Sequence, residues 1–168
     1  MKNLITLIAA VVLVAGLTAT ANAQVTGTAT GSATIITPIA ITKTVDMNFG
    51  NIAVGASLGT VVLATDNTRT KSGGVTLPAA AGTVTAAQFT VTGLGTSTFS
   101  ITLPTTYSIA SGANTMNIDT FTSTPSGIGT LVGGSLTIKV GATLDVAASQ
   151  AAGSYTNATG FPVVVNYN

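Results

Sequence analysis

The side chains that could carry acid–base or nucleophilic chemistry are few in this chain. It contains no His and no Cys, and all of its carboxylate side chains are Asp. They are widely spaced, at Asp46, Asp66, Asp119 and Asp145. No local motif therefore supplies a paired acid and base, or a nucleophile activated by a neighbouring His or Cys. We predict that the protein is not an enzyme and has no catalytic residue.

The residue types give equally little support to a metal or cofactor site. Zinc sites need Cys or His ligands, and calcium loops need closely spaced oxygen ligands, which the scattered Asp residues do not provide. The Gly93-Leu94-Gly95 motif is not followed by the helix that a dinucleotide fingerprint requires. The sequence therefore predicts no metal and no cofactor.

The chain also carries very little charge. Charged residues make up 5% of it, and beyond the first 23 residues the four Asp are balanced by Lys43, Arg69, Lys71 and Lys139. We therefore expect no long-range attraction to nucleic acid or to an anionic membrane surface. A surface with so few charges lacks the like-charge repulsion that keeps soluble monomers apart, which favours self-association.

Residues 1–23 are predicted to be a secretory signal peptide. A positive start at Met1-Lys2-Asn3 precedes an apolar run from Leu4 to Leu17, and Ala21-Asn22-Ala23 forms a small-x-small cleavage site. The apolar run is shorter than the roughly 20 residues that span a bilayer, so a membrane anchor is the weaker alternative. We expect export to the periplasm, the outer surface or the extracellular medium, with no membrane insertion of the mature protein.

Residues 24–35 alternate strictly between small or apolar side chains and hydroxyl side chains. In an extended strand, one face carries Val25, Gly27, Ala29, Gly31, Ala33 and Ile35, and the other carries Thr and Ser. Such a strand buries little apolar area by itself and needs a sheet edge to join. Two pairings are open at this point: the segment is the first strand of its own domain, or it is donated to a neighbouring molecule.

Residues 36–168 are predicted to form one all-β domain, an antiparallel β-sandwich of about eight to ten strands. Short alternating segments recur between Gly-rich turns, and no helical pattern interrupts them. The most regular stretch is 88–104, which carries Phe89, Val91, Phe99, Ile101 and Leu103 in alternation with Thr and Ser. The sequence predicts a long β-hairpin there, with both strands facing one core.

The most polar stretch, residues 65–74, is predicted to be an exposed loop. An exposed loop of this kind can bind a ligand, such as a surface glycan or another protein. This interpretation makes the protein a self-complete secreted binding or adhesion module, and it stands as the alternative to a structural role.

Several short motifs give the chain a resemblance to a known family. They are DMNFGNI (46–52), QFTVTG (88–93), FSITLP (99–104) and the ending GSY (153–155) with VVVNYN (163–168). The chain is similar to the exported bacterial domains called domain of unknown function 4402. It also resembles pilin-like and spore-coat-like subunits, which implies an immunoglobulin-like fold and polymerisation through an N-terminal extension that fills a neighbour's groove. The resemblance implies no catalytic residue.

These observations together favour a non-enzymatic, exported structural subunit. We expect it to associate with itself or with homologous subunits into a cell-surface filament or matrix, through β-strand addition by residues 24–35.

Overall fold

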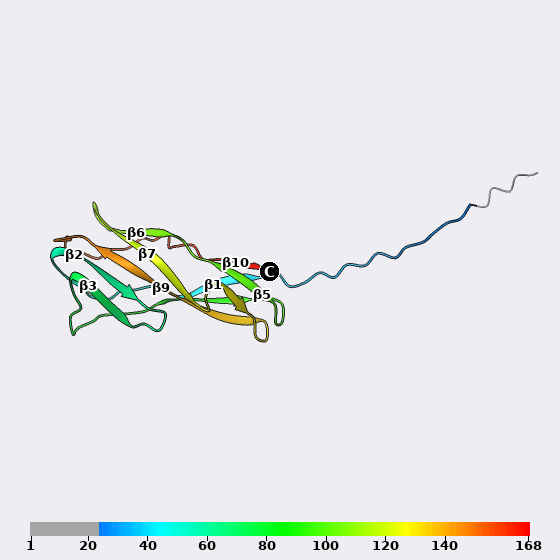
Figure 1. The fold of residues 1–168 in the computed structure, drawn as a ribbon, viewed down its shortest axis with the longest axis horizontal. Helices are drawn as coiled ribbons and strands as arrows, with labels where there is room; N and C mark the ends of the chain where they lie inside the picture. Colours follow the sequence, from blue (N-terminus) through cyan, green and yellow to red (C-terminus); the bar gives the residue numbers. More distant parts are fainter. Residues whose placement is uncertain (1–23) are drawn as a thin grey trace, which may run out of the picture. The chain divides into compact units, whose positions relative to one another are not determined.

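The computed structural model describes residues 24–168, and these form ten β-strands and no helix (Figure 1). The strands are β1 (Ala40–Val45), β2 (Ala53–Leu63), β3 (Arg69–Thr76), β4 (Ala87–Thr92), β5 (Thr98–Thr102), β6 (Thr106–Ser111), β7 (Asn114–Thr124), β8 (Ile128–Thr130), β9 (Ser135–Val146) and β10 (Val164–Tyr167). The predicted all-β class and strand number are confirmed. The predicted signal peptide lies outside the described residues. Within 24–168, no helix is long and apolar enough to cross a membrane.

The larger, seven-stranded sheet is built around β9. One flank of β9 pairs with β4 along its first half and with β2 along its second half, and the other flank pairs with β7. β1 continues the sheet beyond β4, β3 continues it beyond β2, and β6 continues it beyond β7. Alternate side chains of β9 are buried along its length, at Ile138, Val140, Ala142, Leu144 and Val146. This strand therefore contributes to the whole core.

The smaller sheet has the order β10-β5-β8 and packs against one half of the larger sheet. Its buried residues Phe99 and Ile101 share a core cluster with Phe89 and Val91 of β4. A second cluster lies towards the end of β9 and contains Phe49, Val61, Leu63, Val75, Ile118, Ala142, Leu144 and Val146. Two antiparallel sheets packed face to face give the protein a sandwich-like fold.

The predicted hairpin over residues 88–104 is wrong in its pairing. β4 pairs with β1 and β9, whereas β5 pairs with β8 and β10 in the other sheet. Residues 93–97 carry the chain between the sheets, and the Gly93 N–H is bonded to the Gly134 carbonyl at 3.0 Å. The two strands do face one core. Alternation reports which face of a strand is buried, and a hairpin and a crossing between sheets give the same alternation.

The prediction of an exposed loop over residues 65–74 is wrong for its second half. β3 begins at Arg69 and pairs with β2. The turn that precedes it is closed by the Asp66 carboxylate, which accepts hydrogen bonds from the Thr68 N–H at 2.9 Å and from the Thr68 hydroxyl at 2.6 Å. A strand at the edge of a sheet tolerates polar and charged side chains, so polarity did not separate the loop from the strand.

The crossing between sheets makes Phe99 a sensitive test of the core. Its side chain is fully buried, whereas the neighbouring Thr98 is exposed. We expect Phe99→Ala to lower the free energy of unfolding by about 3–5 kcal/mol. Thr98→Ala, one residue away on the same strand, should change it by less than about 0.5 kcal/mol. Urea unfolding of the two variants measures both values. Equal effects of the two substitutions would contradict the assignment of faces on β5.

Candidate functional site

The N-terminal segment, residues 24–35, is extended and exposed. No strand is assigned to it, and Val25 and Ile35 are 92% and 98% exposed. No other atom lies within 4 Å of a Cβ built on Gly27 or Gly31. All twelve residues of this segment are exposed, and none of them belongs to a strand of either sheet.

Two edge strands, β1 and β10, end the two sheets on the same side of the sandwich. Among residues 24–168, β1 pairs only with β4, and β10 pairs only with β5. The Tyr167 hydroxyl donates to the Thr37 carbonyl at 3.0 Å and accepts the Leu94 N–H at 2.6 Å, which holds the end of β10 beside the start of β1. Within residues 24–168 no backbone hydrogen bond joins β1 to β10. Residues 39–45 and 161–167 together are called the β1/β10 seam.

Core-facing side chains along the seam are only half-buried. Ile41 lies opposite Val91 of β4, and Val165 lies opposite Ile101 of β5. Val91 and Ile101 are buried, whereas Ile41 and Val165 remain partly exposed. The same partial burial is found for Ile39, Phe161, Val163 and Tyr167. A further strand along the seam would cover this apolar surface.

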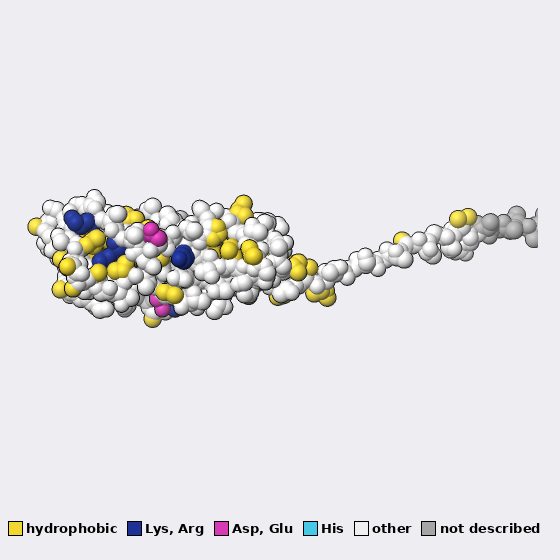
Figure 2. Space-filling view, turned by 90° about the horizontal axis from the view of Figure 1, so that it is seen from below, with side chains coloured by type: hydrophobic (Ala, Val, Ile, Leu, Met, Phe, Trp, Pro, Cys, Tyr) yellow, Lys and Arg dark blue, Asp and Glu magenta, His cyan; other side chains and the backbone are white. Residues whose placement is uncertain are grey.

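The seam has little of the protection that proteins give to free sheet edges. Charged residues, Pro and bulges are common devices that stop an edge from pairing with another chain. β10 has no charged residue, and Val164 is exposed on it, although Pro162 lies in the seam just before the strand. On β1 these devices lie at the two ends: Pro38 precedes the strand, and a bulge and the 2.6 Å Lys43–Asp46 ion pair mark its last residues. Figure 2 shows how few charges lie on one face of the protein.

The edge of β6, by contrast, is covered by the chain itself. Ala110 and Thr156 exchange two backbone hydrogen bonds of 3.0 Å each. The ring of Phe161 then packs at centroid distances of 6.2, 5.7 and 5.0 Å against Phe89, Tyr107 and Phe121. Residues 147–160 therefore close one side of the sandwich, and the Phe161 ring anchors the chain where it enters the seam.

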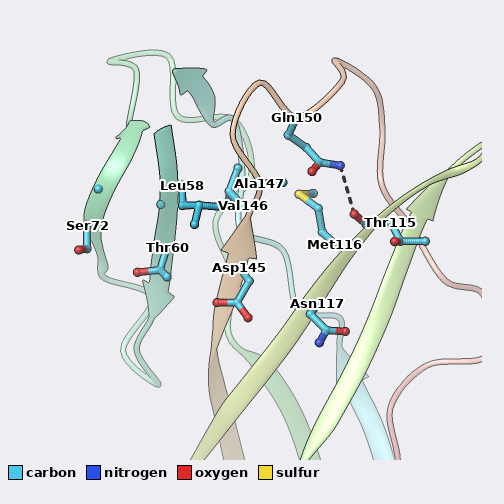
Figure 3. Close-up of a pocket in the computed structure, with 12 residues that line it drawn as sticks. Leu58, Thr60, Ser72, Thr115, Met116, Asn117, Asp145, Val146, Ala147 and Gln150 are labelled. Carbon is cyan, nitrogen blue, oxygen red and sulfur yellow. Dashed lines mark hydrogen bonds between the residues drawn. The ribbon is translucent and has the colours of Figure 1, made fainter. Parts of the chain in front are cut away.

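A surface pocket of about 540 Å³, open to solvent and called the cavity below, lies at the end of the larger sheet where β9 finishes (Figure 3). Strands β2, β3, β7 and β9 and residues 147–150 line it. Strand register places Thr60 opposite both Asp145 and Ser72. Figure 3 shows Asn117 on the side of Asp145 that faces away from Thr60. The Gln150 amide donates a hydrogen bond to the Thr115 carbonyl at 3.2 Å. The cavity therefore gathers polar side chains from four strands.

Asp145 is the carboxyl group that lines this cavity. Burial raises its pKa, and the neighbouring Asp119 carboxylate raises it further. No side-chain hydrogen bond within residues 24–168 engages the Asp145 carboxylate. Asp66 shows the opposite behaviour, because the hydrogen bonds from Thr68 lower its pKa. Asp145 is thus a half-buried acceptor to which no side chain of residues 24–168 donates a hydrogen bond.

Comparison with known proteins assigns the family. A family model described as domain of unknown function (DUF4402) matches residues 39–167. The chain belongs to this family. The match confirms the resemblance that the short motifs indicate, and no curated protein and no solved structure matches the chain. The matched DUF4402 region contains all ten strands of the described residues and leaves residues 24–38 outside it.

The residues that the sequence analysis singled out, the predicted donor face and the four Asp, lie in different parts of the structure. The six residues of the predicted donor face, from Val25 to Ile35, lie together on the uncovered segment, and their pairing stays a prediction. Of the four Asp, Asp46 forms a surface ion pair and Asp66 closes a turn, while Asp119 and Asp145 lie on neighbouring strands. Sequence reasoning did not find the β1/β10 seam or the cavity, because both depend on strand order.

The two perturbed carboxyl groups predict opposite effects of pH on the stability of the DUF4402 domain. The folded protein holds the Asp145 proton to higher pH than the unfolded chain, so this group costs stability as pH rises from its ordinary pKa of 3.8 through its raised pKa. Asp66 contributes stability that is lost as pH falls below its ordinary pKa of 3.8.

We therefore expect the free energy of unfolding of Asp145→Asn to decrease less than that of the parent protein as pH rises above 3.8. The free energy of unfolding of Asp66→Asn should decrease less than that of the parent protein as pH falls below 3.8. Urea unfolding of each variant from acidic to neutral pH tests this. An Asp145→Asn profile parallel to that of the parent protein would show that this carboxyl group is not perturbed.

Proposed function

We propose that the protein is a non-enzymatic, exported structural subunit that assembles by β-strand addition. Residues 24–35 of one molecule add to the β1/β10 seam of the next, and repetition builds a filament or matrix. The observation that carries this proposal is that one chain combines an exposed segment of alternating side chains with an apolar sheet edge that has no strand partner among the described residues. Backbone hydrogen bonds would supply affinity, and the alternate side chains would set the register.

The dimensions of the two parts are compatible. Twelve extended residues span about 40 Å, and the seven residues of the seam from 161 to 167 span about 23 Å. The donated segment is therefore long enough to run along the seam and still connect to its own domain. The face of the donated segment that would point into the core carries small residues, namely Gly27, Ala29, Gly31 and Ala33. Small residues fit there because half-buried side chains of the seam already occupy part of the space.

Addition to a second molecule is favoured over folding back onto the same chain. Residues 36–39 lead directly from the segment into β1, so pairing with its own seam requires the chain to reverse there. The Tyr167 hydroxyl holds the Thr37 carbonyl at 3.0 Å, and Pro38 follows. A neighbouring molecule can deliver the strand without disturbing this contact.

Other properties support the same proposal. The low charge of the chain removes the repulsion that opposes close association. Export through a signal peptide at residues 1–23 is part of the proposal, and it fits an extracellular assembly. We also infer an immunoglobulin-like arrangement of the sandwich, supported by the two packed antiparallel sheets and the crossing between β4 and β5.

A self-complete binding module is the second candidate, and the cavity at the end of β9 favours it. Light scattering of the mature protein, residues 24–168, separates the two functions. A stable monomer at high protein concentration favours the binding module, whereas a concentration-dependent series of oligomers favours assembly.

Removal of residues 24–32 should abolish assembly and leave the domain folded. Within the described chain, the core clusters contain only residues from Ile39 onward, so the deletion removes no core contact. The mature protein should give an SDS-resistant ladder that collapses on boiling, and the truncated protein should run as a monomer. A truncated protein that forms the same ladder would contradict the proposal.

A peptide of residues 24–35 provides the matched control. At about 100 times its dissociation constant it should stabilise the truncated protein by about 2.7 kcal/mol, seen as a higher melting temperature. Gly31→Leu in the peptide should abolish this gain because it enlarges the inward face. Thr30→Leu, on the opposite face, should preserve it. Equal behaviour of the two peptides would show that strand alternation does not govern binding.

A further inference from the structure

The cavity at the end of β9 is lined by polar side chains that have no role in the proposed strand addition. It lies at the opposite end of this 12-residue strand from Ser135, which neighbours the turn that contacts Gly93. An inference about the cavity therefore stands apart from the proposed assembly through the seam.

A bulge between β2 and β3 shapes one wall of the cavity. The register shifts between Val54 and Gly59, and Gly73 has a positive φ of 68°. A Cβ on Gly73 would collide with the Leu58 carbonyl oxygen, so only Gly fits there. The bulge leaves the Leu58 side chain 72% exposed at the rim. Bulges of this kind re-aim side chains and are frequent beside functional sites.

The polar lining offers acceptors and neutral donors in one row. The Asp145 carboxylate is half-buried and lacks a hydrogen-bond donor among the described residues, and Thr60 and Ser72 extend the row across β2 and β3. Asn117 adds an amide, which can both donate and accept. Leu58 and Met116 supply apolar surface beside these groups.

This combination selects among ligand classes. No Lys or Arg lines the cavity, which disfavours a phosphate or carboxylate ligand. Asp145 is the only carboxylate in the lining, which is fewer than a hard cation such as calcium normally recruits. A neutral ligand with several hydroxyl groups would satisfy the Asp145 acceptor and the hydroxyl and amide groups. Its C–H faces would lie on Leu58 and Met116.

We propose that this cavity binds one neutral sugar unit of a glycan, in which the Asp145 carboxylate accepts a hydrogen bond from one hydroxyl group and the Asn117 amide donates one to an adjacent hydroxyl oxygen. The cavity volume of about 540 Å³ lies within the range of small-ligand sites. The glycan-binding end would then be distant from the seam along β9.

The test is a titration of the ¹⁵N-labelled truncated protein, residues 33–168, with the methyl glycosides of glucose, galactose, mannose and N-acetylglucosamine. The truncated protein keeps every core residue and lacks the donated strand, so failure of assembly does not affect the result. At least one glycoside should cause saturable shifts of the amide resonances of residues 58–60, 115–117 and 145–150.

Asp145→Asn should weaken that binding roughly tenfold or more, the effect expected from losing a charge-assisted hydrogen bond. Asp46→Asn is the control, because it removes a surface carboxylate that pairs with Lys43 and does not line the cavity, and it should leave binding within about threefold. The unperturbed spectrum of each variant verifies its fold. Absence of saturable shifts with all four glycosides would overturn the proposal, and so would equal binding by Asp145→Asn. Displacement of the glycoside by calcium would assign the site to a cation instead.

Discussion

The structure depends on the burial of one face of β9. The alternate side chains from Ile138 to Val146 join both core clusters, and the backbone of the same strand pairs with β4, β2 and β7. A chain without disulfides, and with charged residues at only 5%, has backbone pairing and apolar packing as its means of stabilisation. One strand that supplies both to most of its neighbours explains how ten short strands hold together.

The same constraint explains why the sandwich stays incomplete at one side. Both edges of β9 are hydrogen-bonded to neighbouring strands. Unpaired backbone N–H and C=O groups therefore occur on the outermost strands of each sheet. Residues 147–160 cover the edge of β6, but the described part of the chain provides no strand between β1 and β10. Ile41 and Val165 are half-buried there because no neighbour covers them. An apolar edge of this kind favours pairing with another chain, and the low charge of the protein does little to oppose it.

The amino-acid sequence predicts which face of a strand is buried better than it predicts which strands pair with one another. Alternation correctly predicts that Phe89, Val91, Phe99 and Ile101 are buried, but it does not show that β4 and β5 belong to different sheets, because pairing is a long-range property. The polarity of residues 69–74 conceals β3 for a similar reason, since an edge strand need bury only part of its surface. The seam and the cavity were not predictable, because half-burial at Val165 and the row from Asp145 to Ser72 arise from strand order and register. The family, by contrast, is marked by short local motifs, and the match over residues 39–167 confirms it.

The central claim is that residues 24–35 of one molecule occupy the seam of another, and intermolecular disulfide trapping tests it most directly. The chain has no native Cys, so Cys can be placed singly at Gly27, Ala29, Gly31 or Ala33 of a donor protein, and at Val165 of an acceptor protein that lacks residues 24–32. Strand pairing brings some opposing residues within the Cα separation that a disulfide requires. The account predicts that at least one donor variant forms an oxidised donor–acceptor dimer with Val165→Cys, and that none does so with Val164→Cys, whose side chain points away from the core. Equal trapping at the two acceptor positions, or no trapping at either, would contradict it.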